Sequence, residues 1–152
     1  MTIPPGHEFE YGTDGPKILV VGVDGSTTSM RAGAYAAGLA RRQRSRLVVV
    51  YVSRPGAFVG LAPGAAAVAR QADHELAEDL RRQAEEATAS VGLKITFQEV
   101  YGDPYTELVR VADEVNADGV IVGASMRAGH RFAGSLAIRL VKTGKWPVTV
   151  VP

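Results

Sequence analysis

The sequence predicts an α/β fold: a five-stranded parallel sheet in the order 3-2-1-4-5 with helices on both faces. Short apolar segments alternate along the chain with segments of helical periodicity, and such alternation favours a parallel sheet with right-handed crossovers. Two of the apolar segments are nearly continuous runs of β-branched residues, which are typical of strands buried on both faces. The length of 152 residues fits one domain with a sizeable core.

Five segments are predicted to form the strands. Residues 17–23 and 46–52 are the two β-branched runs, and residues 119–122 form an apolar run before a glycine-rich loop, so these three are predicted to be central. Residues 94–100 alternate apolar and polar side chains, which indicates a strand nearer an edge. Residues 147–151 form the last strand, whose apolar, uncharged sequence predicts an edge that is paired or covered.

Capping signals and apolar periodicity predict four helices between these strands. Ser26 or Thr27 can cap the first helix, which runs to about residue 42, and Asp103 with Pro104 begins the third. The second helix is predicted over about residues 66–89, and its charged face is interpreted as solvated, without chemistry. The last helix runs over about residues 135–142. The predicted apolar stripes of the first three helices are Met30, Ala34, Ala37 and Leu39; Val68, Ala72, Leu76, Leu80 and Ala84; and Leu108, Val111, Ala112 and Val115.

Composition excludes several classes of protein. The chain has no cysteine, which excludes disulfides, Cys-ligated zinc and thiol catalysis and fits a cytoplasmic location. Its formal net charge of +1 provides no general attraction to nucleic acid or to a membrane surface. No segment reaches the roughly 18–20 apolar residues of a membrane span. Residues 1–15 lack the features of a signal peptide and are predicted to form a flexible tail before a domain of residues 16–152.

The predicted strand order places a ligand crevice between the first and fourth strands. Ligands of such folds bind outside the carboxyl ends of the strands, where the strand order reverses. The two strands end at residues 23–25 and 122–124, so two glycine-bearing turns should meet there. Asp24 could accept hydrogen bonds from a ligand in this crevice, or it could serve only the turn before the first helix.

Residues 123–135 form a glycine-rich loop that leads into the last helix, a combination typical of anion pockets. Gly123 would let a ligand approach the strand end, or it could serve only a tight turn. Gly134 and Ser135 open the last helix, whose first N–H groups could hold a phosphate, although Ser135 would be a good cap in any case. Three further candidates, which could face either a phosphate or water, are Arg127, His130 and Arg131.

No catalytic motif is present in the sequence. The three histidines are isolated from one another, and no P-loop, nucleophile elbow, dinucleotide fingerprint or His-Glu-x-x-His motif occurs. The chain is therefore predicted not to be an enzyme.

Taken together, these motifs resemble the universal stress protein family, whose UspA-like domains have the Rossmann-like adenine nucleotide alpha-hydrolase-like fold. The resemblance covers about residues 16–152 and includes the strand-turn segment 18–26, the Gly-Asp-Pro of residues 102–104, the strand 117–123 and the final segment 146–151. It implies a cytoplasmic stress-response protein that is usually a homodimer. The apolar, uncharged edge strand of residues 147–151 predicts that the two copies pair through this C-terminal strand. One branch of the family binds ATP and another does not.

The binding branch carries the motif G-x2-G-x9-G-[S/T], from which this chain departs. Gly123 and the Gly134-Ser135 pair match, but Met126 occupies the second glycine position and the spacer is two residues shorter. Gly129 could partly replace the missing glycine, and the cationic loop residues could compensate with charge. By resemblance, Asp24 and the backbone of Val52 would address adenine, Gly123 would meet ribose, and Gly134, Ser135 and Leu136 would meet the phosphates.

The sequence thus leaves two functions open. The first is a sensor or regulator that binds ATP or another adenine nucleotide, such as AMP or cyclic AMP, with magnesium as an optional companion and with any ATP hydrolysis slow or incidental. The second is a nucleotide-free dimeric interaction module of the same family. In this second case a side chain such as Met126 or Phe132 would fill the crevice.

Overall fold

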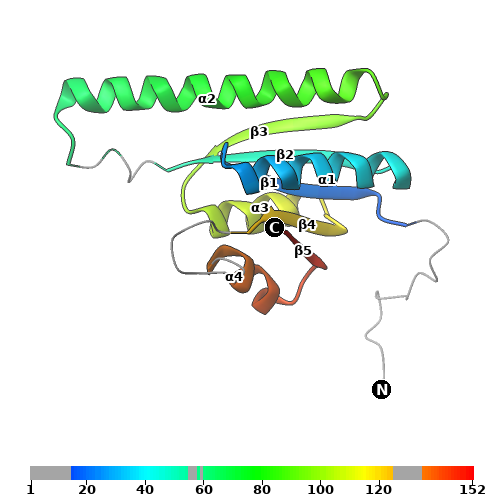
Figure 1. Ribbon diagram of the computed structural model, residues 1–152. Coiled ribbons are helices and arrows are strands. Elements are labelled where there is room, and N and C mark those ends of the chain that lie inside the picture. The colour runs from blue at the N-terminus through cyan, green and yellow to red at the C-terminus, as the bar shows by residue number, and fades with distance from the viewer. Residues whose placement is uncertain (1–14, 55–57, 59, 125–134) are drawn as a thin grey trace.

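A computed structural model describes residues 15–54, 58, 60–124 and 135–152 of the chain. Its five strands form one parallel sheet in the order β3-β2-β1-β4-β5, which confirms the predicted fold class (Figure 1). The elements are β1 (Ile18–Val23), α1 (Thr27–Gln43), β2 (Arg46–Ser53), α2 (Pro63–Ala89), β3 (Ile95–Tyr101), α3 (Pro104–Glu114), β4 (Gly119–Gly123), α4 (Ser135–Thr143) and β5 (Val148–Val151).

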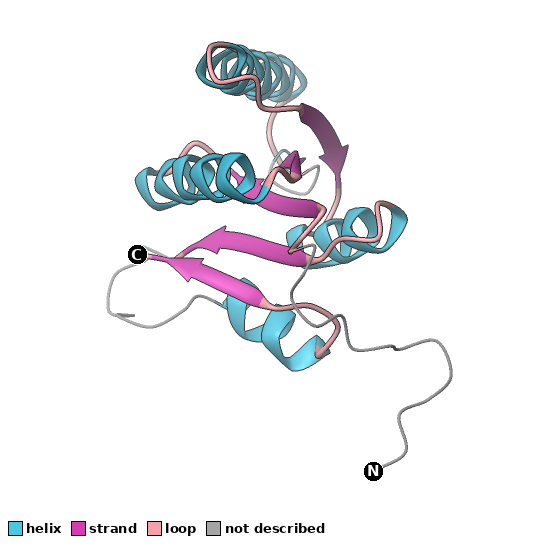
Figure 2. Ribbon diagram, turned by 90° about the vertical axis from the view of Figure 1, so that its right-hand side faces the viewer, coloured by secondary structure: helices cyan, strands magenta, loops and turns pink. Residues whose placement is uncertain are grey.

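The core forms two layers, one on each face of the sheet (Figure 2). On one face, α1 and α2 cover side chains such as Val21, Val49 and Ile121, while α3 and α4 cover Val20 and Val48 on the other. Strands β1, β2 and β4 are buried on both faces because helices cover both sides of them. The nearly continuous β-branched runs in the sequence therefore reflect the two-sided burial that they predicted.

Local capping chemistry starts α1 and α3 at the predicted places. The Ser26 hydroxyl accepts a hydrogen bond from the backbone N–H of Ser29 at the start of α1. The Asp103 carboxylate accepts one from the N–H of Thr106 at 3.0 Å, with Pro104 at the first position of α3. These hydrogen bonds satisfy N–H groups that have no partner within the helix.

The predicted buried stripe of α1 is partly wrong. Its buried residues are Thr28, Ser29, Ala32, Ala36 and Ala40, whereas Ala34 is exposed. Small side chains at a spacing of four residues let the helix lie close to the sheet, so the larger Met30 and Leu39 pack at the flanks and are only partly buried. Of the predicted stripe of α3, Leu108, Val111 and Ala112 are buried, whereas Val115 lies just past the end of the helix and is half-buried.

Helix α2 differs most from its prediction. It begins at Pro63 rather than near residue 66, and of its predicted stripe Val68 is 71% exposed and Leu76 38% exposed. Its buried residues are Ala66, Ala77, Leu80 and Thr88, and Figure 1 shows its N-terminal half extending past the end of β3. The apolar periodicity of this half therefore does not correspond to contact with the core. The other predicted element boundaries differ from the observed ones by at most one residue.

Two further predictions concern the N-terminal tail and the absence of a membrane-spanning segment. The predicted tail of residues 1–15 lies, apart from Gly15, outside the described residues. Among the helices of the described ranges, none combines the length and the apolar character that crossing a lipid bilayer requires.

Candidate functional site

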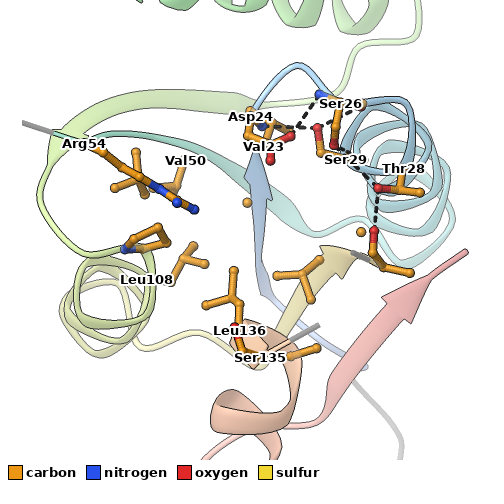
Figure 3. A pocket seen from close by; sticks show the side chains of 17 residues that line it. Val23, Asp24, Ser26, Thr28, Ser29, Val50, Arg54, Leu108, Ser135 and Leu136 are labelled. Carbon is orange, nitrogen blue, oxygen red and sulfur yellow. Dashed lines mark hydrogen bonds between the residues drawn. The ribbon is translucent and has the colours of Figure 1, made fainter. Parts of the chain in front are cut away.

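A cavity of about 530 Å³ opens at the carboxyl ends of β1, β2 and β4 (Figure 3). The first turns of α3 and α4 close two of its sides through Pro104 and Ser135. The cavity lies where the strand order reverses between β1 and β4, which is the crevice that the sequence predicts. Asp24 and Gly123, which end these two strands, both line it.

Apolar side chains line the strand side of the cavity. Val50 and Val52 come from β2, Val122 comes from β4, and Leu108 reaches across from α3. For Val52, only a contact between its backbone and the ligand was predicted. The structure shows that Val52 is half-buried and lines the cavity. Such a lining suits the flat, weakly polar face of a heterocyclic base, with specificity left to a few polar groups.

Asp24 is held by the turn that joins β1 to α1. Its Oδ1 accepts a hydrogen bond from the N–H of Ser26 at 2.9 Å, and its own N–H donates to the Ser29 hydroxyl at 3.1 Å. Burial raises the pKa of the Asp24 carboxyl, but the hydrogen bonds from Ser26 and Ser29 and the charge of Arg54 lower it further, so the net pKa lies below the ordinary value. The group is therefore an ionised acceptor at neutral pH.

Gly123 is required by packing as well as by any ligand. A Cβ at this position would lie 2.5 Å from the carbonyl carbon of Thr28 and 2.6 Å from the backbone nitrogen of Ser29. The first turn of α1 thus lies directly against the end of β4, and the Thr28 hydroxyl donates to the carbonyl oxygen of Ala124 at 2.6 Å. The two glycine-bearing turns do meet, and close contact between chain segments is one reason for the glycine.

Ser135 and Leu136 line the side of the cavity that α4 provides. Ser135 is the first residue of this helix, so the N–H groups of its first turn lack intrahelical partners. These groups and the helix dipole favour negative charge at this end of the cavity.

Arg54 is a residue of the cavity that sequence reasoning did not identify. It follows the end of β2 and lines the cavity, and Figure 3 shows its guanidinium directed toward the middle of the pocket. Within the described residues Arg54 has no hydrogen bond or ion pair, although its charge lowers the pKa of both Asp24 and Asp103. The strand order itself could have indicated it, because β2 ends beside β1 at the same edge of the sheet.

Five predicted site residues lie outside the described residues, namely Arg127, Gly129, His130, Arg131 and Gly134. The two side chains predicted to fill the crevice in a protein without nucleotide, Met126 and Phe132, lie outside the described residues too. Among the described lining residues there is no histidine, and the Ser29 hydroxyl is engaged with the carbonyl oxygen of Ser26 at 3.0 Å. The described arrangement can therefore bind a polar, anionic ligand, but it presents no nucleophile paired with a base.

Comparison with known proteins assigns the chain to a protein family. The family model of the universal stress protein family matches residues 16–152. The chain belongs to the universal stress protein family. Among curated relatives, a universal stress protein of Methanocaldococcus jannaschii is 28% identical over 138 residues, which cover 89% of this chain and 81% of that protein.

Solved structures of universal stress proteins share the fold. A family member from Burkholderia pseudomallei is 27% identical with a TM-score of 0.73, and the match covers 90% of this chain and 96% of that one. A universal stress protein in complex with cyclic AMP is 28% identical with a TM-score of 0.67, again over 90% of this chain and 96% of the other. Adenine nucleotides are thus ligands within the family.

Proposed function

We propose that this universal stress protein binds an adenine nucleotide in the cavity between β1 and β4 and acts as a sensor or regulator in a stress response. The observation that carries the proposal is the cavity itself: an apolar lining, an ionised acceptor at Asp24, a cation at Arg54 and a helix N-terminus at Ser135. The relative in complex with cyclic AMP supports the same class of ligand.

The dimensions and chemistry of the cavity suit a mononucleotide. A volume of about 530 Å³ lies within the range of roughly 300–1,000 Å³ typical of small-molecule sites. In the proposed orientation the base lies on Val50, Val52 and Leu108, and the exocyclic amine donates to Asp24 or to the backbone of Val52. The phosphate then points toward Ser135, where N–H groups without intrahelical partners favour an anion.

Magnesium would accompany only a polyphosphate such as ATP. The described residues of the cavity offer one carboxylate, Asp24, and its Oδ1 already accepts from Ser26. Magnesium bound with nucleotides commonly keeps several waters and relies on phosphate oxygens. The ion would therefore arrive with the ligand and would be held by it.

Binding rather than turnover is the proposed activity. Phosphoryl transfer depends on positioned metal ions, cations and a residue that orients the nucleophile. Among the described lining residues we find a single arginine and no histidine, so any ATP hydrolysis is expected to be slow or incidental.

Isothermal titration tests this proposal. The purified, nucleotide-stripped full chain is titrated with ATP, AMP and cyclic AMP, each with and without magnesium. Saturable binding of at least one nucleotide is expected. If ATP is the only nucleotide that requires magnesium, the site accommodates a polyphosphate together with its ion. Absence of heat with all three ligands at millimolar concentration would overturn the proposal.

A second candidate function has its own supporting observation. Strand β5 lies at the edge of the sheet, and all four of its residues are half-buried rather than buried. We propose that two copies pair through β5 to form a homodimer, which would cover its three valines and pair a strand edge that has no partner strand within the described residues. If the titration fails, a nucleotide-free dimeric interaction module becomes the better account of the chain.

A further inference from the structure

A cluster of ligand-type side chains lies on the charged face of α2, away from the nucleotide cavity. His74 and Glu78 are one helical turn apart on α2, and Glu99 faces them from β3. One ligand atom from each of the three lies within 4.8 Å of the other two. The sequence had given this face no chemistry, because the contribution from β3 becomes visible only in the fold.

The Glu99 carboxylate is the most fixed member of this cluster. Its side chain is only 13% exposed, and its Oε1 accepts a hydrogen bond from the Tyr101 hydroxyl at 3.2 Å. Its other oxygen, Oε2, lies 3.6 Å from Nδ1 of His74, whose side chain is 56% exposed. A tyrosine that orients a carboxylate from behind is typical of the outer shell of a metal site.

A second set of hydrogen bonds connects α2 to the sheet at Asp73, the residue next to His74. The Asp73 carboxylate accepts from the hydroxyls of Tyr51 and Ser53, both of which are buried in β2. Burial raises the pKa of the Tyr51 hydroxyl, and so does the Asp73 carboxylate, which keeps this donor protonated. These hydrogen bonds of the half-buried Asp73 therefore help to fix the position of His74, its neighbour in sequence, relative to β3.

We propose that His74, Glu78 and Glu99 bind a zinc ion between α2 and β3. Imidazole nitrogen and carboxylate oxygen are both established zinc ligands, and imidazole favours zinc over magnesium and calcium. A tetrahedral site with bonds of about 2.0–2.1 Å needs ligand atoms roughly 3.4 Å apart. The ligand atoms lie within 4.8 Å of one another, so the exposed side chains of His74 and Glu78 would have to move closer together, and Glu78 would leave its ion pair with Arg81.

The fourth ligand of this ion is a water molecule. A second cavity of about 400 Å³ adjoins the cluster and is lined by His74, Glu99, Arg70 and Tyr101 among others. A site with three protein ligands and one open position is the arrangement of catalytic rather than closed structural zinc sites. Here the open position faces a water-accessible cavity, so the ion remains exchangeable.

The ion has a structural consequence for α2. Only four of the 27 residues of this helix are buried, so few apolar contacts hold it to the sheet. Zinc would add a cross-link between α2 and the edge strand β3 close to the Asp73 hydrogen bonds. Because the ion binds the folded state, it would stabilise the protein by an amount that rises with the logarithm of the ratio between its concentration and its dissociation constant.

Competition with a chromophoric zinc chelator tests the site on the nucleotide-free full chain. We expect the parent to bind one zinc ion, with the dissociation constant raised at least about tenfold by H74A, E78Q or E99Q. Tyr101→Phe should weaken binding by roughly tenfold through loss of its hydrogen bond to Glu99. The matched control is E75Q, which removes a charge from the same helix but from a side chain bonded to Gln71 at 3.0 Å.

Thermal unfolding with and without zinc provides an independent measurement. Zinc should raise the Tm of the parent and of E75Q, and at the same zinc concentration it should raise the Tm of E99Q less. Equal zinc affinity in the parent and in H74A would overturn the proposal, because the ion would then lie elsewhere. No zinc binding by a folded parent would overturn it too and would leave His74 and Glu99 as a simple contact between two side chains.

Discussion

At the residue scale, the nucleotide cavity combines an apolar lining with two charged side chains, Asp24 and Arg54. Asp24 has a defined partner in the N–H of Ser26, whereas Arg54 has no hydrogen bond or ion pair within the described residues. An arginine without such a partner that is directed into a cavity is available to an anionic ligand. The two side chains therefore have different expected roles, with Asp24 addressing the base and Arg54 the negative charge.

Arg54→Gln should weaken binding of charged nucleotides selectively. Loss of one partly solvated contact between a cation and a phosphate is worth about 1 kcal/mol, roughly a fivefold increase in Kd. AMP and cyclic AMP should lose this factor, while adenosine should bind the variant and the parent alike. Arg54→Lys serves as the control that keeps the charge. An equal loss for adenosine and AMP, measured by titration calorimetry, would show that Arg54 contacts the nucleoside instead.

Asp103→Ala should destabilise the protein in a pH-dependent way. The hydrogen bonds from the backbone and hydroxyl of Thr106 lower the pKa of Asp103, so folding favours its ionised form. The stabilisation is complete above the unfolded value of about 3.9 and is lost as pH falls through the lower folded value. At pH 7 we expect a loss of about 1 kcal/mol in the free energy of unfolding, measured in urea.

The loss caused by Asp103→Ala should shrink near pH 3, because the parent carboxylate is then being protonated. Asp103→Asn is the control, since asparagine caps a helix nearly as well but does not titrate. A difference between the parent and the alanine variant that is the same at both pH values would contradict the role of the ionised cap.

At the scale of elements, the packing of α1 against the end of β4 determines the shape of the cavity. The close approach at Gly123 brings the Asp24 turn and the end of β4 together. The sequence predicted the meeting of these turns, since parallel strands of known order end at the same edge. It could not predict which faces of α1 and α2 are buried, because the rotation of a helix depends on the shape of the partner surface.

Local signals and tertiary consequences differ in how well they were predicted. Ser26 and Asp103 were identified as caps because a cap depends on chemistry within a few residues. Arg54 and Glu99 were missed because their neighbours come from other strands and helices. Short-range hydrogen bonds can therefore be predicted from the sequence. Contacts between residues far apart in the chain form only when the sheet is assembled, so the sequence alone does not indicate them.

Gly123→Ala should destabilise the fold whether or not a ligand is bound. The added methyl would meet the backbone of Thr28 and Ser29, which cannot move without displacing α1. Overpacking of this kind costs typically 1–3 kcal/mol, and we expect about 2 kcal/mol by urea denaturation. The control is Gly38→Ala within α1, where a Cβ meets nothing within 4 Å.

The control Gly38→Ala should stabilise the protein slightly, because alanine is the better helix former in a helix interior. If Gly123→Ala is as stable as the parent, the close approach of α1 to β4 is not a constraint. A loss of nucleotide binding in a Gly123 variant must therefore be judged against its stability.

At the scale of the whole molecule, the described part of the chain forms a sheet with a cavity at one end of its strands and with β5 as an edge strand. The helices leave Val148 and Val150 only half-buried, and both pack against the layer formed with α3 and α4. Pairing of two such edges would join two sheets into one without disturbing either cavity. The predicted homodimer follows from this edge rather than from the nucleotide site.

Sedimentation equilibrium of the full chain should report a dimer at micromolar concentration. Thr149→Lys should shift the molecule toward the monomer, because a charge on an edge strand disfavours strand pairing. Nucleotide affinity should be unchanged, since Thr149 does not line the nucleotide cavity. A parent that sediments as a monomer would reject pairing through β5.

The central claim is that an anionic ligand binds at the N-terminus of α4, and reversal of the local charge tests it most directly. Ser135→Glu adds a negative charge that favours the helix through its dipole but repels a phosphate, while Ser135→Gln is its neutral match in size. Calorimetric titration with the best nucleotide should give binding for the parent and for Ser135→Gln, with at least about a tenfold loss for Ser135→Glu. Equal affinity in Ser135→Glu and Ser135→Gln would contradict the claim, because the phosphate would then lie elsewhere.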